Sequence, residues 1–204
     1  MKKITQLFLI TTAVILLGFD KPQKTTISPI QVVIDVSHGG TDAGAIKNGI
    51  SEKQLVEALA KKIKSTNNDV RIHFTRNEDK TLTLQERTEY INSLKPDFVL
   101  SIHINANKDN TKSGLELYTS QENKFSDKSV EKANELRQKL LKHDFFKSSS
   151  VKTAPFYILK NSNAPAVIVE LGFLTNENDY KYLTDSNSQD KIASSISEYL
   201  SELK

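Results

Sequence analysis

The sequence predicts a single α/β domain with a partly parallel sheet. The chain of 204 residues is long enough for one hydrophobic core and short for two, and its 37% hydrophobic and 26% charged residues are typical of a globular domain. Short apolar runs alternate along the chain with longer segments of helical period. This alternation is typical of α/β proteins, in which helices connect neighbouring strands.

Residues 1–20 have the pattern of a secretory signal peptide. Lys2 and Lys3 precede an apolar stretch from Ile4 to Phe19, as in the charged and apolar regions of such a signal. The stretch is shorter than the roughly 20 apolar residues that a spanning helix needs. We therefore expect an exported protein of the periplasm or cell envelope. Because no Ala-x-Ala cleavage site follows, contact with the membrane through an uncleaved anchor is the alternative.

Residues 21–29 contain two prolines and several polar residues, which indicates a linker, and residues 30–204 form the predicted domain. Six short runs within this domain are predicted to be strands, because they are apolar and bounded by turn-forming or polar residues. These runs are Gln31–Val36, Val70–Thr75, Phe98–His103, Gly114–Thr119, Phe156–Leu159 and Val167–Glu170.

Four helices are predicted from capping signals and from apolar residues that recur with helical spacing. Ser51 with Gln54, and Thr83 with Glu86, have the spacing of capping boxes and mark the starts of the first two helices. The third is centred on residues 130–140, and the fourth runs from about residue 192 to the C-terminus.

Charge and cysteine content exclude several classes of protein. The net charge of +3 comes from 28 basic and 25 acidic residues without basic blocks, so nucleic acid is not an expected partner. Cysteine is absent, which excludes disulfides and a lipid-modified cysteine. Stability after export must therefore come from packing.

Four residues that carry chemistry stand where an apolar run stops or a helix begins: His38, Glu52, His103 and Glu170. In open α/β sheets the carboxyl ends of the strands converge on one crevice, so these side chains can meet there. Two imidazoles and a carboxylate are the ligand set of a hydrolytic zinc site with an open position, and a further glutamate is a candidate general base. The pattern predicts a metallohydrolase.

Each of these residues also has a structural explanation when it is taken alone. A histidine at a strand end is more often a hydrogen-bonded structural residue than a ligand, and Glu52 in a first helical turn complements the helix dipole. Glu170 is harder to explain, because a carboxylate that follows four apolar residues is costly to bury without a partner. The other histidines, His73 and His143, are expected to lie within a strand and near a helix end, outside the site.

Several blocks of the sequence resemble the zinc-dependent N-acetylmuramoyl-L-alanine amidases. They occur in the order and spacing of that family, from about Gln31 to the C-terminus. The blocks are Val33–Gly40 with Asp42 and Gly44, Glu52-Lys53, Thr75-Arg76, Leu84 with Glu86-Arg87, Ser101–His103 with Asn105-Ala106, and Val169–Asn176. One difference from the family is Ser37, which stands where the family usually has a glycine before the first histidine. This difference affects the geometry of the turn and removes no ligand.

The resemblance implies a fold, an activity and roles for the four residues. The family folds as a twisted mixed sheet flanked by helices, here mostly parallel and six-stranded. His38, Glu52 and His103 would be the Zn²⁺ ligands and Glu170 the catalytic glutamate. The substrate would be peptidoglycan or its muropeptides, cut at the amide between the muramic acid lactyl group and L-alanine. Asp35 and Asn105 are near these residues in the sequence and are expected to be partners of the ligands.

Two other functions are weighed against an amidase. A zinc carboxypeptidase could use the same ligands, but it needs an arginine that grips a terminal carboxylate, and nothing in the sequence marks one of the four arginines for that purpose. A catalytically inactive wall-binding regulator would not need all four site residues.

Residues 120–153 have room for one helix only. The inhibitory helix of some family members is therefore not expected, and no activator protein is predicted.

Overall fold

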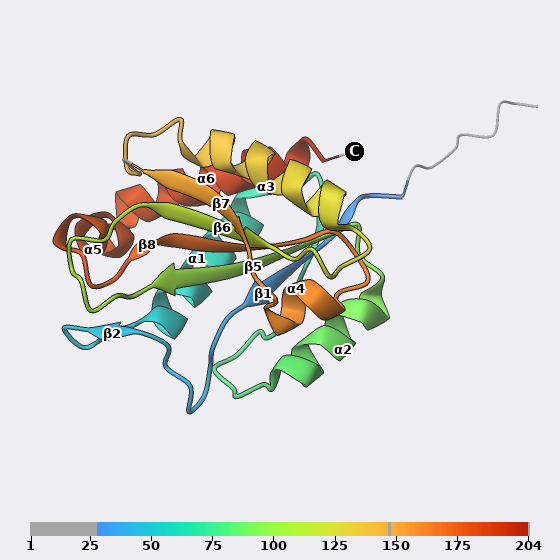
Figure 1. Cartoon of the computed structure of the whole chain (residues 1–204), viewed down its shortest axis with the longest axis horizontal. Helices are drawn as coiled ribbons and strands as arrows, with labels where there is room; N and C mark the ends of the chain where they lie inside the picture. Colours follow the sequence, from blue (N-terminus) through green and yellow to red (C-terminus); the bar gives the residue numbers. More distant parts are fainter. Residues whose placement is uncertain (1–27, 147, 204) are drawn as a thin grey trace, which may run out of the picture.

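The computed structural model describes residues 28–146 and 148–203 (Figure 1). The predicted signal, residues 1–20, and the predicted linker up to residue 27 lie outside the described residues. Within the described ranges, no helix is long and apolar enough to cross a membrane.

A six-stranded sheet forms the centre of the domain, in the order β4-β1-β5-β8-β6-β7. Its strands are β1 (Gln31–Val36), β4 (Arg71–Phe74), β5 (Phe98–Asn105), β6 (Leu115–Thr119), β7 (Ser149–Thr153) and β8 (Ala166–Phe173). Neighbouring strands are parallel except for β6 and β8, which are antiparallel. The predicted α/β class with a mixed, mostly parallel sheet is confirmed. A separate hairpin is formed by β2 (Ile46–Lys47) and β3 (Ile50–Ser51).

Helices cover both faces of the sheet (Figure 1). One face carries α1 (Glu52–Thr66), α3 (Ser126–Leu140) and α6 (Ser186–Ser201), with α5 (Glu177–Thr184) at its edge. The opposite face carries α2 (Leu84–Leu94) and the short α4 (Tyr157–Asn161). Both predicted capping boxes are present, since Gln54 accepts from the backbone N–H of Ser51 and Glu86 from that of Thr83.

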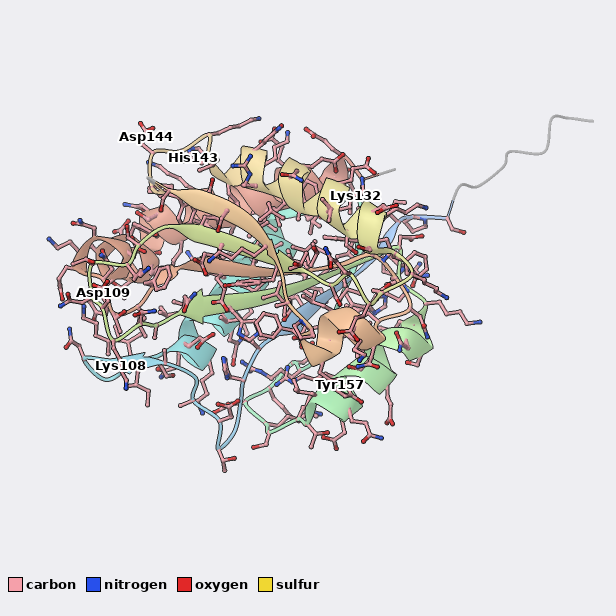
Figure 2. All side chains as sticks on the ribbon, in the orientation of Figure 1. Lys108, Asp109, Lys132, His143, Asp144 and Tyr157 are labelled. Atoms are coloured by element: carbon pink, nitrogen blue, oxygen red, sulfur yellow. The ribbon has the colours of Figure 1, made fainter. Side chains whose placement is uncertain are left out.

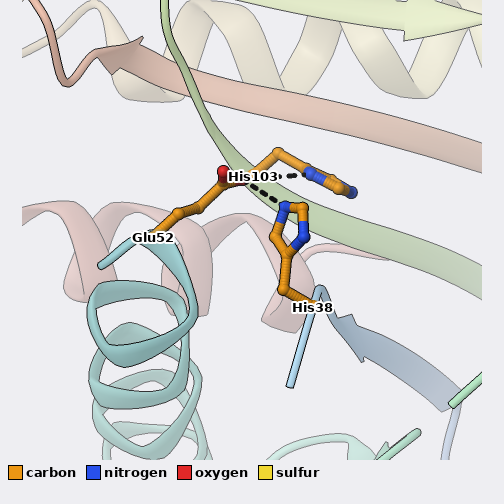
Figure 3. Close-up of side chains that lie close together, drawn as sticks. All are labelled: His38, Glu52 and His103. Atoms are coloured by element: carbon orange, nitrogen blue, oxygen red, sulfur yellow. Dashed lines mark hydrogen bonds and ion pairs between the residues drawn. The ribbon is translucent and has the colours of Figure 1, made fainter. Parts of the chain in front are cut away.

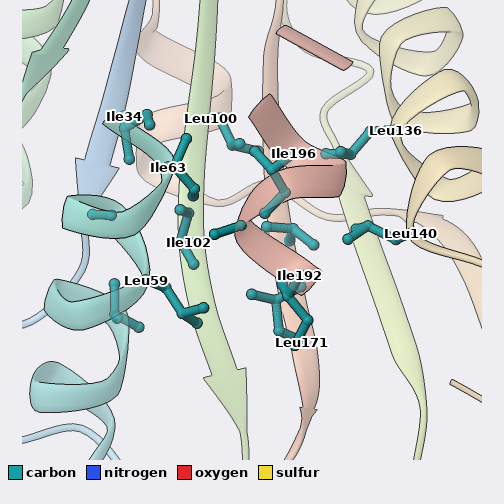
Figure 4. Packing of buried hydrophobic residues seen from close by; sticks show 14 of the residues in the cluster. Ile34, Leu59, Ile63, Leu100, Ile102, Leu136, Leu140, Leu171, Ile192 and Ile196 are labelled. Atoms are coloured by element: carbon teal, nitrogen blue, oxygen red, sulfur yellow. The ribbon is translucent and has the colours of Figure 1, made fainter. Parts of the chain in front are cut away.

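The larger core lies between the sheet and the helices α1, α3 and α6 (Figure 4). Side chains from the strands, such as Ile34, Leu100 and Ile102, pack there against Leu59 and Ile196 from the helices. Each fully buried side chain of this size contributes about 1.5–3 kcal/mol to folding. This packing holds the carboxyl ends of β1 and β5 and the start of α1 in fixed positions.

The prediction of a strand over Phe156–Leu159 was wrong. Residues from Tyr157 onward form α4, in which Ile158 and Leu159 are buried while Phe156 and Tyr157 are exposed. A run of four apolar residues does not distinguish a strand from a short helix by periodicity, and here two adjacent residues are buried together, which alternation in a strand does not allow.

The sixth strand is instead β7, a polar segment at the edge of the sheet. An edge strand needs no continuous apolar run, so its serines and lysine gave no strand signal. Two other strands are longer than expected, because β5 continues to Asn105 and β8 to Phe173. Glu170 therefore lies inside β8 and not at its end.

Candidate metal and catalytic site

His38 lies in the turn that follows β1 and has a φ of 56°, in the left-handed region that residues other than glycine rarely adopt. Its backbone carbonyl accepts a hydrogen bond from the guanidinium of Arg87. Its ring Nδ1 lies 2.8 Å from Oδ2 of Asp42. Asp42 therefore favours the tautomer with the proton on Nδ1, which leaves Nε2 free as a ligand atom.

Glu52 is the first residue of α1, and its side chain is only 6% exposed. The carboxylate accepts hydrogen bonds from the backbone N–H groups of Ala45 and Ile104. The close packing of this loop requires a glycine at position 44, where an added Cβ would lie 2.5 Å from Oε2 of Glu52 and 2.8 Å from the His38 ring. The helix start and the loop together fix the orientation of the carboxylate.

His103 on β5 completes a cluster with His38 and Glu52 (Figure 3). Oε1 of Glu52 lies 2.9 Å from Nε2 of His38 and 3.2 Å from Nδ1 of His103. One ligand atom from each residue lies within 4.8 Å of the other two. The structure thus brings together three of the four predicted site residues, although 65 positions separate the two histidines in the sequence.

The electrostatics of this cluster suit a cation. Burial by itself would raise the pKa of Glu52, but hydrogen bonds and charge from His103 and His38 hold it well below its usual range. Burial would lower the pKa of His38, whereas Glu52 and Asp42 raise it to about 9. The carboxylates thus create a negative potential in which positive charge is favourable.

The donor set and its surroundings fit a divalent metal ion. Two imidazoles and one carboxylate are an established combination for zinc, and the side chains of His38 and His103 are 19% and 24% exposed, which leaves one side open to a ligand. Asp42 behind His38 is the kind of hydrogen-bond partner that orients a metal-ligating histidine. The three residues can therefore hold a metal ion.

Glu170 lies beside His103, because the two residues are directly paired in the parallel strands β8 and β5. Its Oε2 is buried and has no hydrogen-bond partner in the part of the chain that the structure describes. Burial raises the pKa of Glu170 to about 7, with His103 acting in the opposite direction. A carboxylate with a pKa near neutrality can both accept and release a proton, as a general base and acid must.

A second carboxylate, Glu116 on β6, is paired with Glu170 on the other side of β8. It accepts hydrogen bonds from Asn105, Tyr118 and Lys152. Asn105, which was expected to be a partner of the ligands, thus contacts Glu116. Glu116 was not among the predicted site residues, although its alternation with Tyr118 on a predicted strand places both on one face.

Asp35 is fully buried and accepts hydrogen bonds from Thr75, Arg87 and Ser101. Although the sequence analysis expected it to be a direct partner of the ligands, it is linked to His38 through Arg87. The direct partner is Asp42, which the sequence analysis quoted only as part of a motif. Its spacing of four residues from His38 is the signal that could have identified it.

A cavity of about 150 Å³ lies next to His103 and Glu170. Its other lining residues are Leu84 at the start of α2, Phe156, Tyr157 and Ile158 around α4, and Ile168 on β8. The site therefore has a polar part, which contains the candidate ligands, and an apolar part beside it.

The remaining histidines lie outside this site, as the sequence analysis expected. His73 is on the edge strand β4, where burial and then the charges of Arg71 and Lys64 lower its pKa. His143 follows the end of α3 and packs against Phe145, far from Tyr157 on α4 (Figure 2).

Comparison with known proteins identifies clear relatives. The sequence profile of a family described as N-acetylmuramoyl-L-alanine amidase matches residues 32–202. The N-acetylmuramoyl-L-alanine amidase LytC of Bacillus subtilis is 35% identical over 167 residues, which are 81% of this chain and 34% of LytC. The chain thus spans about a third of the length of this relative.

Solved structures give the same result. An N-acetylmuramoyl-L-alanine amidase from Clostridium difficile 630 superposes with a TM-score of 0.78 and 29% identity, over 84% of this chain and 95% of that one. The CwlD amidase from Clostridioides difficile, solved in complex with the GerS lipoprotein, has a TM-score of 0.76 and 29% identity, over 84% of this chain and 98% of that one.

Proposed function

The chain belongs to the N-acetylmuramoyl-L-alanine amidase family, and on that basis we propose that it is a zinc-dependent hydrolase of peptidoglycan. The bond cut is the amide between the muramic acid lactyl group and L-alanine of the stem peptide. The observation that carries this proposal is the cluster of His38, Glu52 and His103 beside Glu170, whose buried Oε2 has no hydrogen-bond partner among the described residues. This arrangement supplies ligands and a base for amide hydrolysis without a serine or cysteine nucleophile.

In this proposal His38, Glu52 and His103 hold the metal. A zinc ion supplies a Lewis acid, which makes water more acidic and the attacked carbonyl more electrophilic. Glu52 contributes its negative charge from a fixed position, because two backbone N–H groups bind its carboxylate. Asp42 keeps the His38 ring oriented through Nδ1.

Glu170 moves the proton. It accepts a proton from the water that attacks the amide carbon and delivers it to the nitrogen of L-alanine as the C–N bond breaks. Burial beside His103 supports this role, because the pKa of about 7 allows both steps near neutral pH. The products are the lactyl carboxylate of the muramic acid and a stem peptide with a free L-alanine amine.

A carboxypeptidase is less well supported, because the arginines closest in sequence to the family motifs are engaged elsewhere. Arg76 donates to Glu57 and to the backbone carbonyls of Val36 and Ser37. Arg87 donates to Asp35 and to His38 O. Both guanidinium groups therefore support the turn after β1, and neither is placed as a clamp for a peptide carboxylate.

We also propose that the protein acts outside the cytoplasm, in the periplasm or cell envelope, and that residues 1–20 are its export signal. The charged and apolar pattern of these residues supports the proposal. Peptidoglycan is the expected partner, and an activator protein is not needed. The structure of CwlD with a lipoprotein concerns that relative, and it makes independence from an activator a point to test in this chain.

The proposed reaction is tested by mass spectrometry of purified peptidoglycan after digestion. An amidase releases intact stem peptides that begin with an unmodified L-alanine amine. A carboxypeptidase would instead release the C-terminal amino acid and leave the stem attached to the glycan. Release of neither product by zinc-loaded protein would contradict both hydrolase functions and favour a non-catalytic wall-binding protein.

A further inference from the structure

Exposed apolar side chains gather beside the candidate catalytic carboxylate. Six large hydrophobic residues are exposed in the described ranges, and three of them, Leu84, Phe156 and Tyr157, line the cavity next to Glu170 and His103. Their exposed fractions are 54%, 42% and 42%. A group of exposed apolar side chains around a cavity is typical of a ligand-binding surface, whereas scattered single residues need no explanation.

The fold holds these side chains in place. Ile158 and Leu159 anchor α4 in the smaller core, so Phe156 and Tyr157 at its start stay at the surface. The ring of Phe156 packs edge-to-face against Tyr118, with centroids 5.2 Å apart. Leu84 follows directly after the capping box of α2, which fixes its backbone. The apolar wall is thus present before a ligand binds.

The charge of the lining distinguishes the two halves of the proposed substrate. Apart from His103 and Glu170, every residue around the cavity is apolar or aromatic, and no lysine or arginine is among the lining residues of the described chain. The peptide half of the substrate carries carboxylate groups, which would lose water here without gaining a cationic partner. The muramoyl half is neutral once its lactyl group is in amide linkage, and it offers methyl groups and the apolar face of a sugar ring.

We propose that Leu84, Phe156 and Tyr157 form the subsite for the muramoyl half of the substrate. This inference rests on the proposed amidase function. The apolar face of the sugar packs against Phe156 and Tyr157, while the lactyl group and the amide lie over Glu170 and the ligand cluster. The stem peptide then leaves the cavity on the side away from α4.

The test compares two substrates on one variant. The first is an N-acetylmuramoyl peptide, and the second is the same peptide with an N-lactoyl group, which lacks the sugar. Tyr157→Ala should lower kcat/KM for the muramoyl substrate by about tenfold, mainly through KM, since one apolar contact in a pocket discriminates by at least this factor. The lactoyl substrate should be affected by less than about twofold, because it never makes the contact.

Matched variants and a stability measurement complete the test. Tyr90→Ala removes an aromatic residue of similar exposure, 38%, from α2 outside the cavity, and it should change neither reaction. Phe156→Leu keeps the cavity apolar and should retain more activity than Phe156→Ala at equal thermal stability. An equal loss on both substrates with Tyr157→Ala, at a thermal stability equal to that of the wild type, would overturn the proposal, because it would mean that the cavity binds the peptide half.

Failure of the proposed function can be distinguished from failure of the subsite. If the wild-type protein cleaves neither substrate, the function is wrong, and binding to the wild-type protein then tests the cavity. Titration calorimetry with uncharged N-acetylmuramoyl amide should show binding that Phe156→Ala weakens. Absence of this binding, or binding that Phe156→Ala leaves unchanged, would overturn the subsite as well.

Discussion

Arg87 donates a hydrogen bond to the backbone carbonyl oxygen of His38, and its guanidinium also binds the buried carboxylate of Asp35. The two side chains of this ion pair are 4% and 1% exposed. His38 has a left-handed backbone conformation, which the surrounding structure must stabilise. The ion pair between Arg87 and Asp35 thus fixes the turn that presents His38, a candidate metal ligand.

Replacing Arg87 with methionine should lower the free energy of unfolding by about 3–5 kcal/mol, because the Asp35 carboxylate is then buried without its partner. Urea denaturation measures this loss. The double variant with Asp35→Asn should be more stable than the sum of the single effects predicts. Lys61→Ala, which removes an exposed pair with Glu57, should cost less than about 1 kcal/mol. Additive effects of the two buried changes would contradict the coupling.

Asp35 also predicts how stability depends on pH. Burial would raise its pKa, but the charge of Arg87 and hydrogen bonds from Ser101 and Thr75 hold the pKa below its usual value in the folded protein. The folded state therefore binds fewer protons than the unfolded state, and the contribution of the Asp35 carboxylate to the free energy of unfolding is fully present above about pH 5. This contribution is lost as the pH falls through the pKa of Asp35 in the folded state, which lies below its pKa of about 3.9 in the unfolded state.

This second prediction is checked by urea denaturation of the wild type and of Asp35→Asn between pH 3 and pH 7. The stability difference between the two proteins should be largest above about pH 5 and should shrink toward acid pH. A difference that stays constant over this range would show that the Asp35 carboxyl does not change its protonation between the folded and unfolded states.

His103→Ala should abolish both zinc binding and turnover, because it removes one of three ligands. Replacing a residue that hydrogen-bonds to a metal ligand typically lowers metal affinity by about 10- to 100-fold, so replacing the ligand itself should lower it further. Metal content after dialysis, measured by atomic emission, and stem-peptide release test this. His143→Ala is the matched control and should leave both intact. A His103→Ala protein with one equivalent of zinc and normal turnover would refute the ligand assignment.

Glu170→Gln should lower the rate much more than the metal content. The loss of a general base typically costs about a hundredfold to ten-thousandfold in rate, while the amide side chain keeps nearly the same shape. Zinc content and substrate KM should stay close to those of the wild type. If the zinc content fell while the rate remained high, Glu170 would be a metal ligand and not the base.

The domain that begins near Lys21 should be active without a partner protein. Among the described residues of the segment from Ser120 to Thr153, α3 is the only helix, and it packs against the sheet and α6, so no second helix of this segment covers the site. Kinetics on soluble muropeptides with the purified domain test this. Activity that is near zero and rises steeply on addition of a wall-associated protein would contradict the prediction.

The sequence predicted the fold class correctly, and it also predicted that His38, Glu52 and His103 lie close together, because the signals for both are local. His38 follows the end of β1, Glu52 begins α1, and His103 lies near the carboxyl end of β5. Parallel strands bring their carboxyl ends to one edge of the sheet. Arg87 was not assigned a role because its partners, Asp35 and His38, lie about 50 residues away in the sequence. Such pairing depends on the packed structure.

One wrong prediction of secondary structure concerns the region that forms the apolar wall. Phe156–Leu159 was predicted as a strand, and the helix α4 that it actually begins places Phe156 and Tyr157 beside Glu170. Four apolar residues are compatible with both structures, and the choice depends on tertiary packing, which the local sequence does not encode. The strand β7 was missed because it lies at the edge of the sheet and its polar residues form no apolar run.

The candidate ligand atoms come from the turn after β1, the start of α1 and the strand β5. An unfolded chain holds these three segments far apart, so a metal site made of them exists only in the folded state. Metal concentration and folding are then linked by mass action. Each tenfold rise in free metal above its dissociation constant raises the free energy of unfolding by about 1.4 kcal/mol. In the proposed zinc enzyme, the supply of the ion therefore sets the equilibrium stability of the fold as well as its catalytic capacity.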